Sequence, residues 1–306
     1  MHTFVRLFFF PLAAFLPLTL LSPQSASAQC AQPGSGAALQ QGECVFATAG
    51  FSRIDPDAPS PFAEDIDVLD ARLGFQRRID DNLFASLSGF TSHSDSSTNT
   101  FGVDLDRRSY GVAASLRKVH ADYLFTAALT GFVAQDDFVR SDLTADQTRY
   151  GGSLSLSAAR IFADEDGLFA IPSIGVSANY QHVEETAAGR PAFGVRASSD
   201  DELVFAVRPA LTLGYDMAIG DAFFRPTIFG GATLLLNEDS SRRLSSDFVQ
   251  LRSNVIRSER DAFRPFAGGG ARVFLGEGFS AALSYSVDFD DNATTHSLVF
   301  GAQFDF

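Results

Sequence analysis

The chain ends in the nine residues LVFGAQFDF (298–306). Read by twos, one face of this stretch holds the apolar Leu298, Phe300, Ala302, Phe304 and Phe306, while the other holds Gly301, Gln303 and Asp305, with Val299 as an apolar exception. Successive side chains of a β-strand point to opposite faces, so this alternation predicts a strand. The strand has one apolar and one polar face and runs to the last residue.

The same alternation recurs through most of the chain. It predicts about 12 strands, at 45–54, 65–77, 82–93, 105–118, 123–135, 147–161, 168–182, 202–217, 222–236, 262–275, 279–289 and 295–306. The apolar faces include Leu154, Leu156, Val176 and Leu283, and the polar faces include Ser155, Ser177 and Ser284. Apolar residues at three- and four-residue steps, which a helix would need, are missing from these stretches.

The connections between the predicted strands alternate in length. Short ones, at 78–81, 119–122, 162–167, 218–221 and 276–278, alternate with longer polar ones at 55–64, 94–104, 136–146, 183–201 and 237–261, and the last, 290–294, is shorter. Short turns at one end and long loops at the other are typical of an antiparallel outer-membrane barrel. A soluble β-sandwich or secreted barrel is the alternative, but its strands are commonly five or six residues long, and it would have to fill one interior with all the apolar faces.

The first 28 residues have the features of a signal peptide. Arg6 precedes an apolar stretch, 7–21, and Ala26-Ser27-Ala28 supplies small residues for cleavage before Gln29. Cys30 suggests a lipoprotein, but Gln29 stands where a small residue should precede a lipidated cysteine. We therefore predict a signal peptide at 1–28, a short leader at 29–44 and a single barrel domain at 45–306, exported to the outer membrane.

The charge balance limits the class of partner, and the two cysteines suggest a disulfide. Acidic residues outnumber basic ones 37 to 23, so no nucleic-acid partner is expected. The two cysteines, Cys30 and Cys44, are predicted to form a disulfide in an exported chain, closing a loop of about 15 residues worth roughly 3 kcal/mol.

Several charged residues fall on the predicted inward face. They are Arg72, Arg117, Arg208, Arg225, Arg264 and Arg272, with Asp70 and Asp288. One interpretation is a lumen that favours anions or seats a plug. The other is that these arginines pair with carboxylates and water, as lumen charges do in any such barrel.

Some polar residues near the predicted loop end are candidates for catalysis. The candidates are Asp136-Asp137, Asp290-Asp291, His93, His182 and His296, but neither an Asp-x-His pair nor a Gly-x-Ser-x-Gly elbow accompanies them. Acidic loops could bridge divalent cations to lipopolysaccharide, yet they lack EF-hand spacing. We therefore predict no catalytic residue, no metal ligand and no cofactor; a surface hydrolase stays an alternative. Gly268-Gly269-Gly270 is interpreted as part of a strand, because no helix or Lys follows it.

The C-terminus also carries a resemblance. Gly301-x-x-Phe304-x-Phe306 resembles the signal read by the outer-membrane barrel assembly machinery, although Val299 replaces the usual polar residue. The segments GEGFSAALSYSVDFDDNATTHSLVFGAQFDF (276–306), LFAIPSIGVSANYQH (168–182) and AFFRPTIFGGATLLL (222–236) are similar to the autotransporter β-domain family. The resemblance covers roughly 65–306. It implies a 12-stranded barrel. The expected partners are outer-membrane lipid, lipopolysaccharide and the barrel assembly machinery; the sequence does not fix the oligomeric state, and a monomer is favoured.

One feature of that family has no counterpart here. Autotransporters carry a large passenger ahead of the barrel, whereas residues 31–43 read only AQPGSGAALQQGE. We therefore expect a barrel without a passenger, acting as a structural surface barrel or as a pore restricted by this leader. The alternative is a small porin whose lumen arginines favour anions.

Overall fold

We describe the protein from a computed structural model. It describes residues 43–56, 66–98, 103–140, 143–188, 195–197, 199–237, 239–246, 254–259, 262–275, 278–290 and 293–306. The predicted signal peptide, most of the leader, and Cys30 lie outside these residues.

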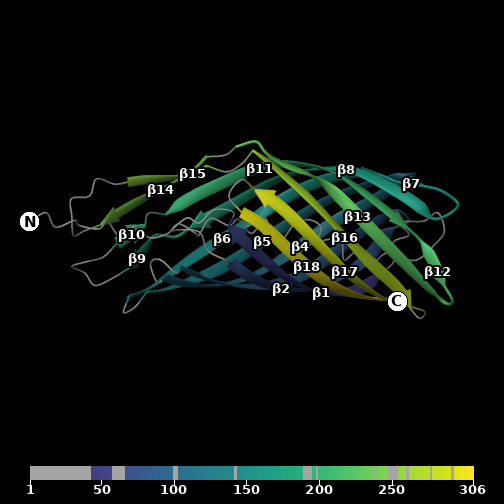
Figure 1. Ribbon diagram of the computed structural model, residues 1–306, viewed down its shortest axis with the longest axis horizontal. Helices are drawn as coiled ribbons and strands as arrows, with labels where there is room; N and C mark the ends of the chain where they lie inside the picture. Colours follow the sequence, from purple (N-terminus) through teal and green to yellow (C-terminus); the bar gives the residue numbers. More distant parts are fainter. Residues whose placement is uncertain are drawn as a thin grey trace, which may run out of the picture.

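The chain folds into a closed antiparallel sheet (Figure 1). Its long strands are β1 (Cys44–Pro56), β2 (Ile66–Asp80), β3 (Leu83–Thr98), β4 (Val103–His120), β5 (Tyr123–Arg140), β6 (Leu143–Arg160), β8 (Leu168–Val183), β11 (Asp200–Tyr215), β13 (Ala222–Leu235), β16 (Phe263–Leu275), β17 (Phe279–Asp290) and β18 (Ala293–Asp305). Each pairs with the next in this order, and β18 pairs with β1 to close the ring. Two short strands, β7 (Phe162–Ala163) and β12 (Met217–Ile219), pair with β8 and β13. Within the described residues the barrel thus has the twelve strands predicted from the alternation.

Several strands run further than their alternation predicted. The loop predicted at 136–146 is wrong, because β5 and β6 stay paired up to Arg140 and Leu143. Beyond the apolar part of a strand the outward side chains are polar, so the alternation fades while the backbone hydrogen bonds continue. The sequence signal ends before the strand does.

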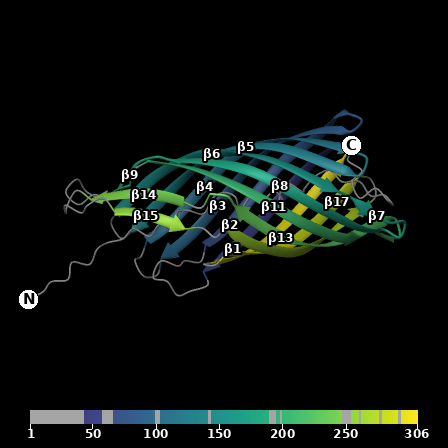
Figure 2. The ribbon, with the colours of Figure 1, turned by 90° about the horizontal axis from the view of Figure 1, so that it is seen from above.

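Two of the predicted long loops contain a second sheet. Strands β9 (Thr186–Ala188), β10 (Val195–Ala197), β14 (Asp239–Ser246) and β15 (Asn254–Glu259) form a separate four-stranded sheet in the order β15-β14-β10-β9. It lies beyond one end of the barrel, opposite β7 and β12 (Figures 1 and 2). We call this end the long-loop end.

The other end, which we call the short-turn end, has tight turns. Ala121, Gly167, Gly220 and Gly278 have positive φ angles of 50°, 97°, 62° and 78° there. Glycine adopts this backbone region without steric cost, which suits it to such turns. The C-terminus also lies at this end (Figure 1), where Phe306 N donates to Glu43 O at 3.2 Å.

The outward face of the barrel is apolar. The side chains of Leu73, Leu129 and Ile228 are 63%, 61% and 62% exposed, and Leu154, Leu156, Val176 and Leu283 are also exposed. Leucine and isoleucine are usually buried in soluble proteins, so this surface requires an apolar surrounding. No helix among the described residues is long and apolar enough to cross a membrane.

The inward face packs phenylalanines over glycines of the neighbouring strand. A Cβ added to Gly214 would lie 2.2 Å from Phe169 Cζ, and one added to Gly111 would lie 2.2 Å from Phe90 Cζ. The same arrangement pairs Phe46 with Gly74, Phe132 with Gly151, and Phe229 with Gly268. Because glycine has no Cβ, each phenylalanine ring occupies the space above the glycine and packs against the inner wall of the barrel. Gly268 to Gly270 lie within β16, as predicted.

Candidate functional site: the arginine-lined lumen

The inside of the barrel is lined by the polar face of every long strand. Hydroxyl groups meet across neighbouring strands: Ser52 Oγ lies 2.9 Å from Ser297 Oγ, and Ser86 Oγ lies 2.7 Å from Ser115 Oγ. Leu154 and Leu156 point outward, while Ser155 between them points inward and pairs with Ser177 of β8. A wall of hydroxyls and charged groups is suited to water and polar solutes.

All six arginines selected from the sequence lie on this inward face. Arg117 and Arg225 are 3% and 8% exposed, and Arg208 and Arg264 are also largely enclosed. Arg72 and Arg272 follow the same inward parity on β2 and β16. The arginines therefore project into the lumen from five different strands rather than gathering at one spot.

Arg225, Arg264 and Arg208 contact carboxylates. Near the short-turn end, Arg225 donates to Asp216 Oδ1 at 2.5 Å. Toward the long-loop end, Arg264 Nη2 lies 2.6 Å from Asp290 Oδ2, and Arg208 Nη2 lies 3.8 Å from Asp288 Oδ1. Each such pair reduces the field that its arginine presents to a solute in the lumen.

Arg72 and Arg272 contact neutral groups. Arg72 Nε donates to Ser88 Oγ at 2.8 Å, and Arg272 Nη1 donates to Gln303 Oε1 at 3.1 Å. A neutral acceptor holds a guanidinium in place without cancelling its charge. Arg72 can therefore act on an anion more strongly than an arginine paired with a carboxylate.

Aromatic rings hold several of the guanidinium groups against the wall. Arg208 Cζ lies 3.9 Å from the centre of the Phe266 ring, and Arg225 Cζ lies 5.1 Å from that of Phe274. A cation over a ring face is attracted by the quadrupole of the ring. Phe266 and Phe274 are each 3% exposed, so aromatic and arginine side chains together take up part of the lumen.

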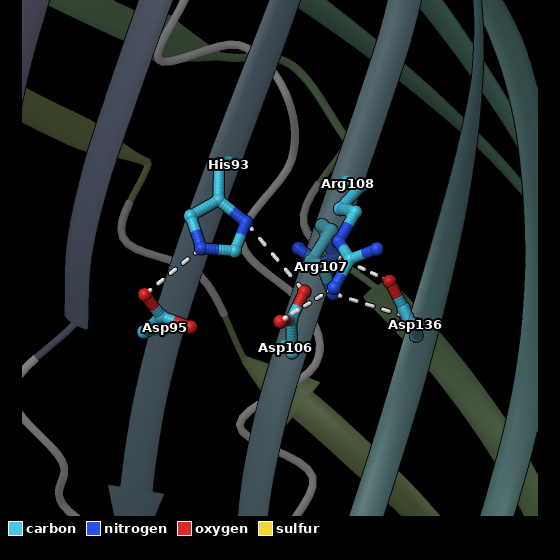
Figure 3. A network of polar contacts seen from close by, with 6 residues as sticks. All are labelled: His93, Asp95, Asp106, Arg107, Arg108 and Asp136. Atoms are coloured by element: carbon cyan, nitrogen blue, oxygen red, sulfur yellow. Dashed lines mark hydrogen bonds and ion pairs between the residues drawn. The ribbon is translucent and has the colours of Figure 1, made fainter.

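A buried charge cluster at the long-loop end was not predicted. Asp136 is fully enclosed between Arg107 and Arg149, and Arg107 Nε donates to Asp136 Oδ1 at 2.6 Å (Figure 3). Arg149 Nε donates to the other oxygen, Asp136 Oδ2. The interpretation of Asp136 as a loop acid was wrong, because β5 continues through it and turns its side chain inward. Arg107 and Arg149 lie within the predicted strands 105–118 and 147–161, so extending the predicted strand 123–135 by one residue is enough to find this cluster.

The other candidates for catalysis lie apart from one another around the long-loop end of the barrel. His93, His182 and His296 face outward, and each lies near a carboxylate: Asp95 at 3.0 Å, Asp201 at 2.8 Å and Asp55 at 3.8 Å. Asp290 faces inward against Arg264. Asp291 lies outside the described residues.

The remaining predicted residues lie near the seam between the first and last strands. Gly301 is enclosed between Thr48 of β1 and Ala282 of β17, while Phe304 and Phe306 point outward, 54% and 73% exposed. Asp70 fills the space above Gly50. Cys44 is fully buried beside Phe46, and its predicted partner Cys30 lies outside the described residues, so that disulfide stays a prediction.

Comparison with known proteins shows the family of this chain and solved structures with a similar barrel. The sequence profile of the autotransporter β-domain matches residues 62–286. The translocator domain of the autotransporter NalP from Neisseria meningitidis is similar in structure, with 17% identity, a TM-score of 0.70, and coverage of 87% of this chain and 89% of that one. For the β domain of the Bordetella autotransporter BrkA the values are 19%, 0.66, 87% and 100%. For the transport unit of AIDA-I from Escherichia coli they are 10%, 0.60, 87% and 91%. At these identities the structural likeness concerns the fold. A sequence search of curated proteins finds no match.

Proposed function

This chain belongs to the autotransporter β-domain family, and we propose that its barrel is a narrow passage whose conduction is restricted. The chain is a translocator-type barrel of the outer membrane. In barrels of this type the short turns lie in the periplasm and the long loops outside, and we infer the same orientation here. The proposal concerns what the lumen of this barrel admits.

The packing of the lumen wall is the observation that carries the proposal. Phe46, Phe90, Phe169 and Phe266 point inward and are between 3% and 8% exposed, with arginines lying over several of the rings. Barrels of about eight strands are filled by side chains, whereas those of 16–18 strands leave an aqueous channel. A twelve-stranded barrel falls between these sizes, and large inward side chains move it toward the narrow side.

The leader is proposed to narrow the passage further. β1 begins at the periplasmic end, where Glu43 O accepts the hydrogen bond from Phe306 N. A segment that joins the barrel there is within reach of the periplasmic mouth. The predicted Cys30–Cys44 disulfide would hold residues 31–43 as a loop close to this mouth.

A second candidate, a small porin that favours anions, is supported by one observation. Arg72 is held by the neutral group Ser88 Oγ. A neutral acceptor leaves the positive charge of Arg72 available to a passing anion. The two candidates differ in how much current the intact barrel carries.

Single-channel recording on the purified barrel tests the proposal. We expect a small conductance from the full mature chain, and a larger one from a variant lacking residues 29–43. In a salt gradient, the reversal potential of the larger current should show anion preference, because the lumen arginines attract anions.

The control is a barrel in which only Cys30 and Cys44 are changed to serine, which keeps the leader but releases the predicted loop. A large anion-selective current of equal size in the full mature chain and in the truncated variant would reject the restricted passage and favour the porin. A small current in both would assign the restriction to the lumen wall alone.

A further inference from the structure

A row of aspartates crosses the outward face near the extracellular end of the barrel. Asp67 of β2 lies opposite Asp95 of β3, and Asp95 lies opposite Asp106 of β4. The row continues, since Asp106 lies opposite Asp137 of β5, and Asp137 lies opposite Asp146 of β6. Neighbouring strands are about 4.8 Å apart, and like charges directly opposite each other are destabilising. Such a row requires compensating positive charge.

One histidine lies within this row of carboxylates. His93 Nε2 is 3.0 Å from Asp95 Oδ2, and His93 Nδ1 is 3.5 Å from Asp106 Oδ1 (Figure 3). One ligand atom from each of the three residues lies within 4.8 Å of the other two. Asp95 is two residues from His93 on the same face of β3. Asp106 of β4 lies directly opposite Asp95. Strand pairing thus brings an imidazole and two carboxylates together.

One oxygen of Asp106 is enclosed without a hydrogen bond. Asp106 Oδ1 has no hydrogen-bond partner among the described residues, and His93 Nδ1 lies 3.5 Å from it. Its other oxygen, Oδ2, accepts a hydrogen bond from Arg108 Nη2 at 3.2 Å. A buried oxygen without a partner costs free energy. Because Arg108 fixes one side of the carboxylate, the other side is directed toward His93.

We propose that His93, Asp95 and Asp106 form a site for a divalent transition metal, with Zn²⁺ as the ion that the donors suit. Zn²⁺ binds imidazole nitrogen and carboxylate oxygen at roughly 2.0–2.2 Å. The imidazole distinguishes this site from an all-oxygen site, which suits Ca²⁺ or Mg²⁺. All three side chains retain solvent exposure, so rotation about side-chain bonds brings the donors to metal-bond length. The position left open faces outward, away from the lumen.

The bound ion would offset the repulsion between Asp95 and Asp106 and bond to the enclosed oxygen of Asp106. It would hold β3 and β4 together beyond the apolar part of the barrel. The sequence alone predicts no metal ligand here, because the row becomes visible only once the register of the strands is known. This site is independent of conduction through the lumen.

Zinc titration of the purified full-length barrel tests the proposal. Chelator-treated protein in detergent is titrated with Zn²⁺ by calorimetry, and Co²⁺ is used in parallel for its absorption spectrum. We expect one equivalent to bind. His93→Ala and Asp106→Asn should each weaken it by about tenfold or more, since each removes one of three ligands. A hundredfold excess of Ca²⁺ should leave the zinc bound.

The matched control is His182→Ala. His182 is also an outward histidine at this end and contacts a carboxylate, Asp201, but it lies outside the proposed site, so zinc affinity should not change. Heat-modifiable migration of each variant confirms that its barrel has formed, and Asp95→Asn serves if His93→Ala does not fold. Wild-type protein without saturable binding, unchanged affinity in Asp106→Asn, lost affinity in His182→Ala, or displacement of zinc by Ca²⁺ would each overturn the proposal.

Discussion

At the scale of single residues, the aromatic ring lying over a glycine is the recurrent contact inside this barrel. Phe169 of β8 covers Gly214 of β11, where an added Cβ would lie 2.2 Å from the ring. We expect Gly214→Ala to destabilise the folded barrel by about 1–3 kcal/mol, the usual cost of overpacking. The midpoint of urea unfolding in lipid vesicles measures this change.

Gly131→Ala is the control for that substitution. A Cβ at Gly131 meets nothing within 4 Å, and alanine restricts the unfolded chain more than glycine does. Its unfolding midpoint should therefore stay the same or rise. If both variants lose the same stability, the ring is not what excludes a side chain at Gly214.

At the scale of an element, the last strand is followed by an aromatic residue that packs little against the barrel. Phe306 is 73% exposed, so its side chain contributes little packing to the finished barrel. We propose that Gly301, Phe304 and Phe306 are read by the assembly machinery. We expect Phe306→Asp to leave much of the protein unassembled in the periplasm, measured by outer-membrane fractionation and heat-modifiable migration.

Phe279→Asp is the matched change on the neighbouring strand. Phe279 also faces outward at the short-turn end and lies opposite Phe304. Because it stands outside the proposed signal, its replacement should reduce assembly much less. Equal loss in both variants would mean that any charge at this end blocks membrane insertion.

The elements also show what a sequence can and cannot predict. Strands with alternating apolar and polar faces, such as β8, were located to within a residue, because the period of the alternation is the period of the backbone. The extension of β5 past Gln135 was missed, since polar residues on both faces erase that signal. The second sheet was missed because pairing between two distant loops leaves no local pattern.

The facing of a side chain and the register between strands also differ in how far the sequence predicts them. The face that a side chain takes follows from counting within a strand, and Arg72 and Arg208 lie on the inward face. The cluster around Asp136 and the row through Asp106 depend on which residue lies opposite which. That register is a property of the closed sheet and is not visible in any one segment.

At the scale of the whole molecule, the barrel has an outside built for lipid and an inside built for water. Leu154 is 51% exposed on the outer face, and its neighbour Ser155 faces inward against Ser177. We expect Leu154→Arg to cost roughly 2–4 kcal/mol of stability in lipid vesicles. Ser155→Arg should cost much less, because its charge enters the polar lumen. Equal costs from equilibrium unfolding would contradict the two-faced barrel.

The pairing of β18 with β1 also governs how fast the molecule can form. Ser52 and Ser297 touch across this seam although 245 positions separate them along the chain. Contacts between residues so distant in sequence lower folding rates, since a large loop must close before they form. Until that step both strands are unpaired edges, which invite aggregation. The chain must therefore be kept apart from other copies of itself until β18 pairs with β1 and closes the barrel.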